Sequence, residues 1–250
     1  MLVPLSPPTF RLDEQALAAR LERRDSLVYL ANPNNPTGGV LLSREAVARL
    51  AARFPKSVFW IDEAYVQYLD PRDHAPVAPI VPLHENVIVS RSFSFAYGLA
   101  AARVGYMVAP PKLVREMDAQ LTPYRVGALP EALAIAALED EEHLPWLRVV
   151  TARERRLLRD GLESLGGIET FASSVNFVLC RFEDGRDASP FARRLATRGF
   201  TIKVFDPVAG HTFAPYFRVT LGTREENARL LDAVRAELDA HDRAMPAAFA

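Results

Sequence analysis

The sequence predicts an α/β protein in which a mostly parallel sheet carries helices on its faces and a smaller α+β domain follows. Short apolar runs at residues 28–31, 58–61 and 87–89 have the length and composition of buried strands, and helix-forming segments separate them. Such alternation is typical of parallel sheets. After Gly166 and Gly167 the order of strands and helices changes, which indicates a second domain.

Polar residues follow each of these three strands. Residues 28–31 end at an Asn-Pro turn, residues 58–61 end at Asp62, and residues 87–89 end before the Ser-Arg-Ser run at 90–92. Open α/β sheets bind ligands at the carboxyl ends of their strands. We therefore expect the three polar motifs to lie at a ligand site.

Helix signals are clearest in two places. Ser43 is suited to cap a helix that buries Val47 and Leu50. Residues 112–165 form a helix-rich middle part, and their strongly charged stretch at 151–156 is interpreted as a solvated helix face.

The last third of the chain predicts the smaller domain. Its pattern indicates three strands and an intervening helix, at residues 175–182 (strand), 190–198 (helix), 200–205 (strand) and 217–221 (strand). A final helix opens with Thr223-Arg224-Glu225-Glu226, which is a capping box.

The composition gives no sign of a nucleic-acid-binding or membrane protein. The formal net charge is −1, and no apolar stretch reaches the length of a membrane span. The single cysteine, Cys180, lies in an apolar run and is predicted to be a buried structural thiol in a cytoplasmic protein. The histidines show no ligand spacing, so no metal is predicted; they are His74, His84, His143, His211 and His241.

Three motifs occur in a specific order along the chain. They are Asn-Pro-Asn-Asn-Pro-Thr-Gly at 32–38, Ile-Asp-Glu-Ala-Tyr at 61–65, and Ser-Arg-Ser-Phe-Ser-Phe-Ala-Tyr-Gly-Leu at 90–99 with Arg-Val-Gly-Tyr at 103–106. Together they resemble the class I/II aminotransferases, which depend on pyridoxal 5'-phosphate and have the aspartate-aminotransferase fold (fold type I).

Within that family the chain is most similar to histidinol-phosphate aminotransferases, because of the runs at 174–179 and 217–227. The resemblance extends from about Leu5 to about Leu238. It implies a three-layer, mostly parallel large domain, here partial and N-terminally truncated, over residues 1–140. An interdomain helix and a small C-terminal α+β domain would occupy residues 141–250.

The resemblance assigns cofactor-binding roles to residues of the first domain. Asp62 would face the pyridine nitrogen and keep it protonated, so that the ring can accept electrons. Asn35 and Tyr65 would hydrogen-bond the phenolic oxygen of the ring, with a cis peptide bond common between Asn35 and Pro36. Ser92, Ser94 and Arg103 would form the cup for the cofactor phosphate.

The resemblance also implies a substrate side. Arg218 would bind the α-carboxylate, and Lys203 stands where histidinol-phosphate aminotransferases usually have an arginine for the substrate phosphate. Asn176 belongs to the same side. By residue type alone, Arg218 also fits an exposed strand arginine.

Other assigned residues have ordinary alternatives as well. Asn35 and Tyr65 fit plain turn or packing residues, and the two serines fit loop residues.

Phe95 occupies the position of the family's Schiff-base lysine. That lysine binds the cofactor covalently and then transfers a proton as general acid and base, which is typically worth ~10²- to 10⁴-fold in rate. Phenylalanine can do neither, and it is expected to project into the volume of the cofactor ring. No catalytic residue is therefore assigned, and ordinary transamination is expected to be absent or very weak.

A second departure lies at the N-terminus. Family chains carry, before the strand that residues 2–5 resemble, a portion with a glycine-containing phosphate-binding turn and a tyrosine that reaches the partner subunit. Nothing in this sequence matches that portion. The sheet is then expected to expose an edge that needs a partner chain or a rearrangement.

Two classes of function follow. The first is a histidinol-phosphate-aminotransferase-like protein that acts on or binds an amino acid or amino-phosphate, including a repurposed lysine-independent decarboxylase, lyase or cyclase. The second is a non-catalytic pseudoenzyme or partner subunit. The second class would keep Arg218 and the phosphate cup for a small anion. Pyridoxal 5'-phosphate, where it is bound, would be held without a covalent bond, and the chain is expected to form a homodimer or to join a chain that supplies the missing N-terminal portion.

Overall fold

The computed structural model describes residues 2–207 and 212–244, the last four of them as backbone only. His211 and the side chain of His241 lie outside the described part. The chain divides into two compact units, which are Met1–Asn35 with Gly39–Val149, and Pro36–Gly38 with Val150–Ala250.

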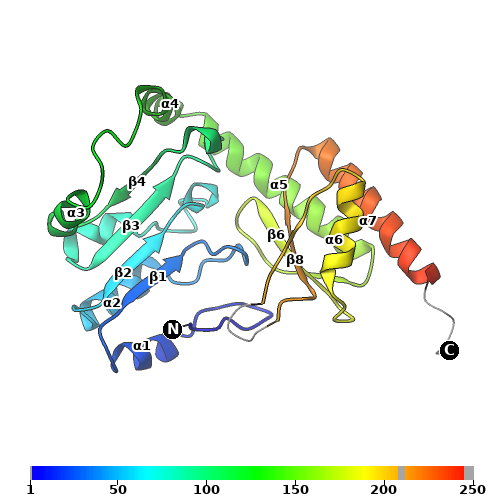
Figure 1. The fold of residues 1–250 in the computed structure, drawn as a ribbon, viewed down its shortest axis with the longest axis horizontal. Coiled ribbons are helices and arrows are strands. Elements are labelled where there is room, and N and C mark those ends of the chain that lie inside the picture. Colours follow the sequence, from blue (N-terminus) through cyan, green and yellow to red (C-terminus); the bar gives the residue numbers. More distant parts are fainter. Residues whose placement is uncertain (1, 208–211, 245–250) are drawn as a thin grey trace. The chain divides into compact units, whose positions relative to one another are not determined.

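The first unit is built on a four-stranded sheet with the order β1-β2-β3-β4 (Figure 1). The strands are β1 (Leu27–Ala31), β2 (Val58–Asp62), β3 (Val87–Ser92) and β4 (Gly105–Val108). β1, β2 and β3 run parallel, and β4 is antiparallel to β3. The prediction of a mostly parallel sheet is confirmed. Asp62 at the end of β2 pairs with Ser90 of β3, so two of the polar motifs are neighbours.

The first unit also contains several helices. They are α1 (Glu14–Leu21), α2 (Arg44–Arg53), α3 (Pro111–Asp118), α4 (Ala128–Glu139) and the short 3₁₀ helices η1 (Val66–Tyr68), η2 (Ala78–Leu83) and η3 (Ala100–Ala102). Ser43 caps α2 as predicted, because its Oγ accepts a hydrogen bond from Ala46 N at 3.2 Å. The long helix α5 (His143–Ser164) begins in the first unit and continues into the second.

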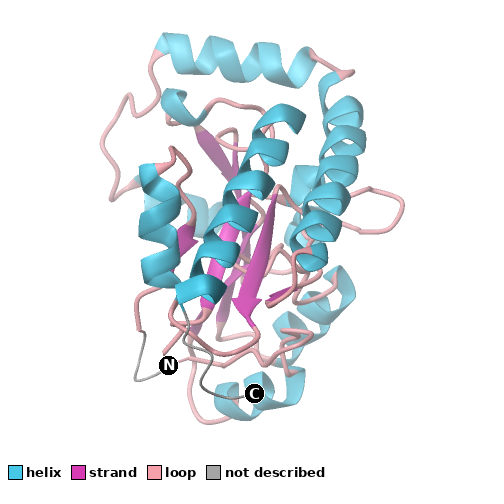
Figure 2. Ribbon diagram, turned by 90° about the vertical axis from the view of Figure 1, so that its right-hand side faces the viewer, coloured by secondary structure: helices cyan, strands magenta, loops and turns pink. Residues whose placement is uncertain are grey.

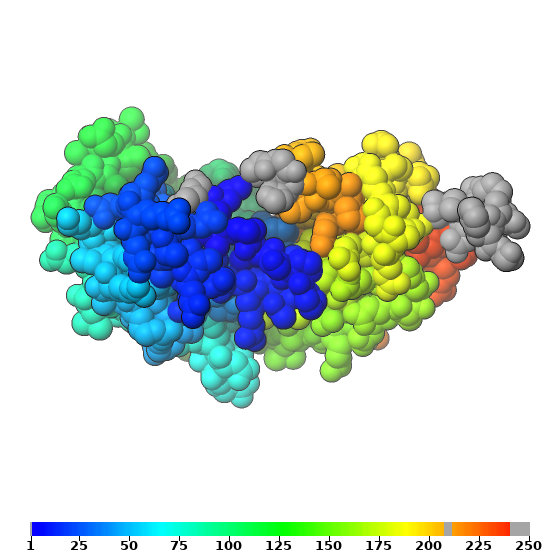
Figure 3. Space-filling model, turned by 90° about the horizontal axis from the view of Figure 1, so that it is seen from below, coloured from blue at the N-terminus to red at the C-terminus, as the bar shows by residue number. Residues whose placement is uncertain are grey.

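The two faces of the first sheet differ in burial. One face packs Leu30, Phe59, Ile61 and the α2 residues Val47 and Leu50 into a core. The other, here called the open face, carries side chains that are exposed or half-buried: Leu27, Tyr29, Trp60 and Met107. β1 is also an edge strand. Figure 3 shows the N-terminal residues, in blue, at the surface.

The second unit has an antiparallel sheet with the order β5-β6-β8-β7. Its elements are β5 (Ile168–Thr170), β6 (Phe177–Phe182), α6 (Ala188–Thr197), β7 (Lys203–Val204), β8 (Tyr216–Thr220) and α7 (Arg224–Ala244). Side chains from β6, β8 and all three helices form one core, and Figure 2 shows the helices lying over the strands. Cys180 is fully buried in this core as predicted, and burial raises the pKa of its thiol.

The structure corrects three of the strand predictions. Residues 2–5 form no strand; instead Leu2 O accepts a hydrogen bond from Arg20 of α1 at 2.6 Å. β3 continues to Ser92, because β4 pairs with its polar end. In the run 200–205 only Lys203–Val204 are strand, because pairing with β8 is limited to those two residues.

The interpretation of residues 151–156 as a solvated face was wrong in part. Thr151 and Glu154 are buried. Thr151 and Glu154 are three residues apart. Leu158 and Leu162 follow Glu154 at intervals of four, and such spacing places all of these side chains on one face of the helix. The face of α5 that packs on the core therefore includes two polar residues.

Candidate functional site

Hydrogen bonds fix the orientation of the Asp62 carboxylate at the end of β2. Its Oδ1 accepts from Ala64 N at 3.1 Å and from Ser90 Oγ at 3.3 Å. Its Oδ2 accepts from the Tyr29 hydroxyl at 2.7 Å. The donors come from β1, from β3 and from the turn after β2, so three segments position one half-buried carboxylate.

Phe95 lies against Tyr65. The two ring centroids are 4.3 Å apart and the planes differ by 18°, which is a stacked arrangement. Tyr65 is buried, whereas Phe95 is 41% exposed. The structure therefore brings the second and third sequence motifs together, and the aromatic ring at the lysine position covers a predicted cofactor ligand.

Ser92 is the last residue of β3, and the loop that it begins contains Ser94 and Arg103 before β4. The loop closes where Phe93 N donates to Val104 O at 3.3 Å, and inside it Ser94 N donates to Ser92 Oγ at 3.0 Å. Arg103 adopts a left-handed backbone conformation and is exposed. Two hydroxyls and a guanidinium in one loop are a donor set that suits an anion.

Asn35 belongs to the turn after β1. It is exposed and, with Tyr29, lines a cavity of about 600 Å³ beside β1 and the N-terminal segment. The turn is held by the buried Asn32, whose Oδ1 accepts from Leu41 N at 2.7 Å. The cis peptide bond of the turn precedes Pro33, so the implied cis bond after Asn35 was wrong.

Lys203 and Arg218 are direct cross-strand partners in the second unit. Partners of this kind project from the same face of an antiparallel pair. The Arg218 guanidinium lies 4.7 Å from the centre of the Phe177 ring. Asn176 is next to Phe177, and its buried Oδ1 accepts no hydrogen bond from the residues that the structure describes. The structure thus brings Lys203 and Arg218 together, whereas no described contact joins the Asn176 side chain to either of them.

Sequence reasoning missed the ion pair between Glu63 and Arg91. Glu63 is fully buried, and its Oε2 accepts from Arg91 Nε at 2.9 Å and Nη2 at 2.7 Å. The pair joins the ends of β2 and β3 next to Asp62 and Ser92. Successive side chains of a strand point to opposite faces of the sheet. Glu63 follows Asp62 and Arg91 precedes Ser92, so both were predictable on the face opposite to the site residues, where opposite charges can pair.

Tyr29 was also missed as a neighbour of Asp62. The sequence indicates this contact less clearly, because Tyr29 reaches Asp62 only in the register that pairs Tyr29 with Trp60 between β1 and β2.

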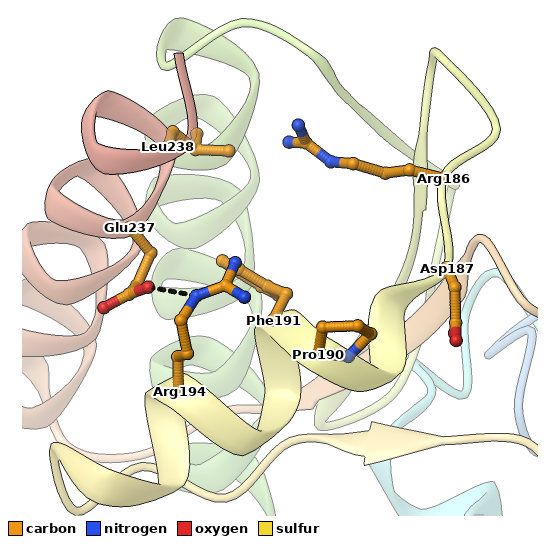
Figure 4. A pocket seen from close by; sticks show the side chains of 7 residues that line it. All are labelled: Arg186, Asp187, Pro190, Phe191, Arg194, Glu237 and Leu238. Carbon is orange, nitrogen blue, oxygen red and sulfur yellow. Dashed lines mark hydrogen bonds and ion pairs between the residues drawn. The ribbon is translucent and has the colours of Figure 1, made fainter. Parts of the chain in front are cut away.

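A smaller cavity, of about 220 Å³, contains none of the predicted residues (Figure 4). Arg186, Arg194 and Phe191 are among the residues that line it. Arg194 and Arg198 donate to Glu237 at 2.6 and 2.7 Å. Burial raises the pKa of Glu237, but these two hydrogen bonds lower it on balance. The charged groups here mainly join α6 to α7.

Within the described residues no group of histidine, cysteine, aspartate or glutamate side chains could hold a metal ion. None of the described helices is both long and apolar enough to cross a membrane.

The polar groups at the carboxyl ends of β2 and β3 lie where open α/β sheets bind their ligands. The family model for aminotransferase class I and II matches residues 1–234. The chain belongs to the class I and II aminotransferase family.

Several relatives are similar over most of this chain. A histidinol-phosphate aminotransferase of Sphingopyxis alaskensis is 38% identical over 92% of this chain and 62% of its own length, and one of an Anaeromyxobacter species is 37% identical over 90% and 60%. The chain thus spans about three fifths of the length of the curated relatives that it matches.

Solved structures agree with this assignment. Histidinol-phosphate aminotransferase from Sinorhizobium meliloti in complex with pyridoxal-5'-phosphate is 30% identical, with a TM-score of 0.80 over 92% of this chain and 62% of that one. L-threonine-O-3-phosphate decarboxylase from Porphyromonas gingivalis is 27% identical, with a TM-score of 0.74 over 86% and 65%.

Proposed function

We propose that this chain binds pyridoxal phosphate without a covalent bond, takes an amino acid or amino-phosphate as its second ligand, and transaminates very weakly or not at all. The observation that carries the proposal is Phe95. It occupies the position where the family has its lysine, and its ring stacks on Tyr65.

The donor set fits this cofactor in two respects. Asp62 is oriented by three donors and offers a carboxylate to a ring N–H. Ser92, Ser94 and Arg103 share one loop and offer hydroxyls and a guanidinium to a phosphate dianion. When bound, pyridoxal phosphate supplies an electron-accepting pyridinium ring. The residues of this chain would bind that ring and orient it.

Neither lysine of the first unit is close to this donor set along the sheet. Lys56 precedes β2, at the opposite end of that strand from Asp62. Lys112 follows β4, whose last residue, Val108, pairs with Val89 and therefore lies away from Ser92. The remaining lysine, Lys203, belongs to the second unit.

The class of the second ligand follows from Lys203 and Arg218. These two cationic side chains project from the same face of the sheet. A ligand that carries a carboxylate, a phosphate or both would offer acceptors to them. The buried Oδ1 of Asn176 would accept a hydrogen bond from the ligand's amino group. Phosphorylated amino compounds also appear in the names of the relatives from Sphingopyxis alaskensis and Porphyromonas gingivalis.

The test compares the wild type with Phe95→Lys during titration with pyridoxal phosphate, followed by visible absorbance and by mass after borohydride reduction. We expect reversible binding with no fixed mass gain in the wild type. Phe95→Lys should gain the mass of one reduced cofactor, because the new amine reaches the bound ring.

Tyr124→Lys is the matched control, because Tyr124 is 99% exposed and distant in sequence from every predicted site residue. It should behave like the wild type. A fixed mass gain in the wild type equal to that of Phe95→Lys would show that another amine replaces the lysine. No binding by any variant would show that the donor set does not hold the cofactor.

A partner is the second part of the proposal. Both faces of a parallel sheet are normally covered, yet the open face carries the exposed side chains of Leu27, Tyr29 and Met107. We infer that this face is covered by polypeptide equivalent to the two fifths of the relatives that the match leaves out. A homodimer through the same face is the alternative outcome.

A further inference from the structure

The Asp62 carboxylate is the end point of a chain of hydrogen bonds that passes from β2 to β3 and back. Trp60 Nε1 donates to Ser90 Oγ at 2.9 Å, and Ser90 Oγ lies 3.3 Å from Asp62 Oδ1. An indole N–H can only donate. Ser90 therefore accepts from Trp60 and uses its single hydroxyl hydrogen to donate to Asp62, so the direction of this chain is determined.

Tyr29 holds the other oxygen of the same carboxylate. Its hydroxyl donates to Asp62 Oδ2 at 2.7 Å, which is the length of a strong bond from O–H to a carboxylate. Tyr29 and Trp60 are cross-strand partners, and their rings meet edge to face with centroids 6.0 Å apart. The phenol is therefore oriented by packing as well as by its hydrogen bond.

The phenol keeps its proton over the physiological range. Partial burial, and then the hydrogen bond to Asp62 and its negative charge, raise the pKa of Tyr29 to about 12. Each carboxylate oxygen can accept two hydrogen bonds. With Tyr29 as one donor, Oδ2 can still accept a second hydrogen bond.

We propose that Tyr29 is a positioning residue, which fixes the rotation of the Asp62 carboxylate so that Oδ2 is presented to the ring N–H of a pyridine cofactor. The inference rests on the proposed function, because it needs a ring at Asp62. The contrary possibility is that Tyr29 competes with the ring for this oxygen. The two ideas predict opposite effects when the hydroxyl is removed.

The test uses Tyr29→Phe, which keeps the ring and removes the hydroxyl. A hydrogen bond to a charged group corresponds to roughly a 3- to 10-fold change in a binding constant for a partly exposed donor. We expect the dissociation constant for pyridoxal phosphate to rise by about that factor in Tyr29→Phe. Tyr124→Phe makes the same chemical change at a fully exposed position and should leave the constant unchanged.

A second readout needs no cofactor. Nuclear magnetic resonance of ¹³Cζ-labelled tyrosine, with Tyr29 assigned by its loss in Tyr29→Phe, reports the titration of the phenol. We expect its midpoint in the wild type near 12 and a lower midpoint in Asp62→Asn. An unchanged midpoint would mean that the two side chains do not interact in solution.

The outcomes separate the two proposals. If the wild type binds pyridoxal phosphate and Tyr29→Phe binds it equally well or more tightly, the positioning role is wrong while the proposed function stands. If neither protein binds the cofactor, Asp62 receives no ring and both proposals fail.

Discussion

The charged pair of Glu63 and Arg91 lies directly behind the candidate site. Glu63 has no exposed surface, and Arg91 contacts it through two nitrogens. Because the pair ties the ends of β2 and β3 together, it also sets the spacing between Asp62 and Ser92 on the other side of the strands.

Removal of one charge from this pair should destabilise the first unit. In Glu63→Gln the Arg91 charge stays largely buried without its counter-ion, and breaking a buried pair in this way costs about 3 kcal/mol. Urea unfolding would measure the change in the free energy of unfolding.

The exposed pair of Arg44 and Glu45 offers a matched control. Glu45→Gln should produce a much smaller change, because water solvates exposed charges. Equal effects of the two substitutions would contradict a structural role for Glu63.

At the scale of the element, the start of α7 shows how a local signal works. Thr223 Oγ1 accepts from Glu226 N at 3.2 Å, and Glu226 Oε2 accepts from Thr223 N at 2.7 Å. The predicted capping box is confirmed. It satisfies two backbone N–H groups that the first turn of the helix leaves without partners.

Thr223→Ala should lower the stability of the second unit by about 1 kcal/mol, as loss of an N-cap does. The contribution also depends on pH. The hydrogen bonds from Thr223, that of its backbone first, lower the pKa of Glu226. A carboxyl group whose folded pKa is lowered stabilises above its unfolded pKa, and this part is lost as the pH falls through the folded value.

Thermal unfolding at pH 7 and at pH 3 would measure both effects. The difference between Glu226→Gln and the wild type should be smaller at pH 3, because the carboxylate is then protonated. Most of the loss in Thr223→Ala should persist at both pH values, because alanine keeps the backbone N–H that donates to Glu226. Thr201→Ala, at an exposed loop position, should change little at either pH. A loss in Glu226→Gln that is the same at both pH values would contradict the reciprocal box.

At the scale of the whole molecule, the open face of the first sheet leaves apolar side chains exposed that a sheet of this kind normally buries. Leu27 is 63% exposed and Met107 is 36% exposed on a sheet that is otherwise built like a buried one. Exposed apolar side chains grouped on a single face mark an interaction surface.

We expect this chain to form a one-to-one complex with a polypeptide made from the part of the Sphingopyxis alaskensis relative that the match leaves uncovered. Light scattering after size-exclusion chromatography would measure the mass. Full burial of a leucine contributes about 1.5 to 3 kcal/mol, so Leu27→Lys should weaken the complex by at least roughly tenfold.

Leu83→Lys is the matched control, because Leu83 is exposed on η2 and away from the open face. It should leave the complex intact. Mass corresponding to a pair of identical chains, unchanged when the second polypeptide is added, would favour the homodimer instead.

The sequence by itself determined the family, the alternation of strands and helices, the caps of α2 and α7 and the burial of Cys180. These features depend on residues close together in the chain or on the apolar character of a single segment. Tertiary structure alone decided which side chains meet. Tyr29 and Asp62 are 33 positions apart, and Glu63 and Arg91 are 28 apart.

The physical reason is that such contacts follow from strand order and register, which apolar periodicity does not specify. The same holds for Phe95. The sequence shows that a phenylalanine replaces the family's lysine at this position. Only the folded loop decided that its ring stacks on Tyr65.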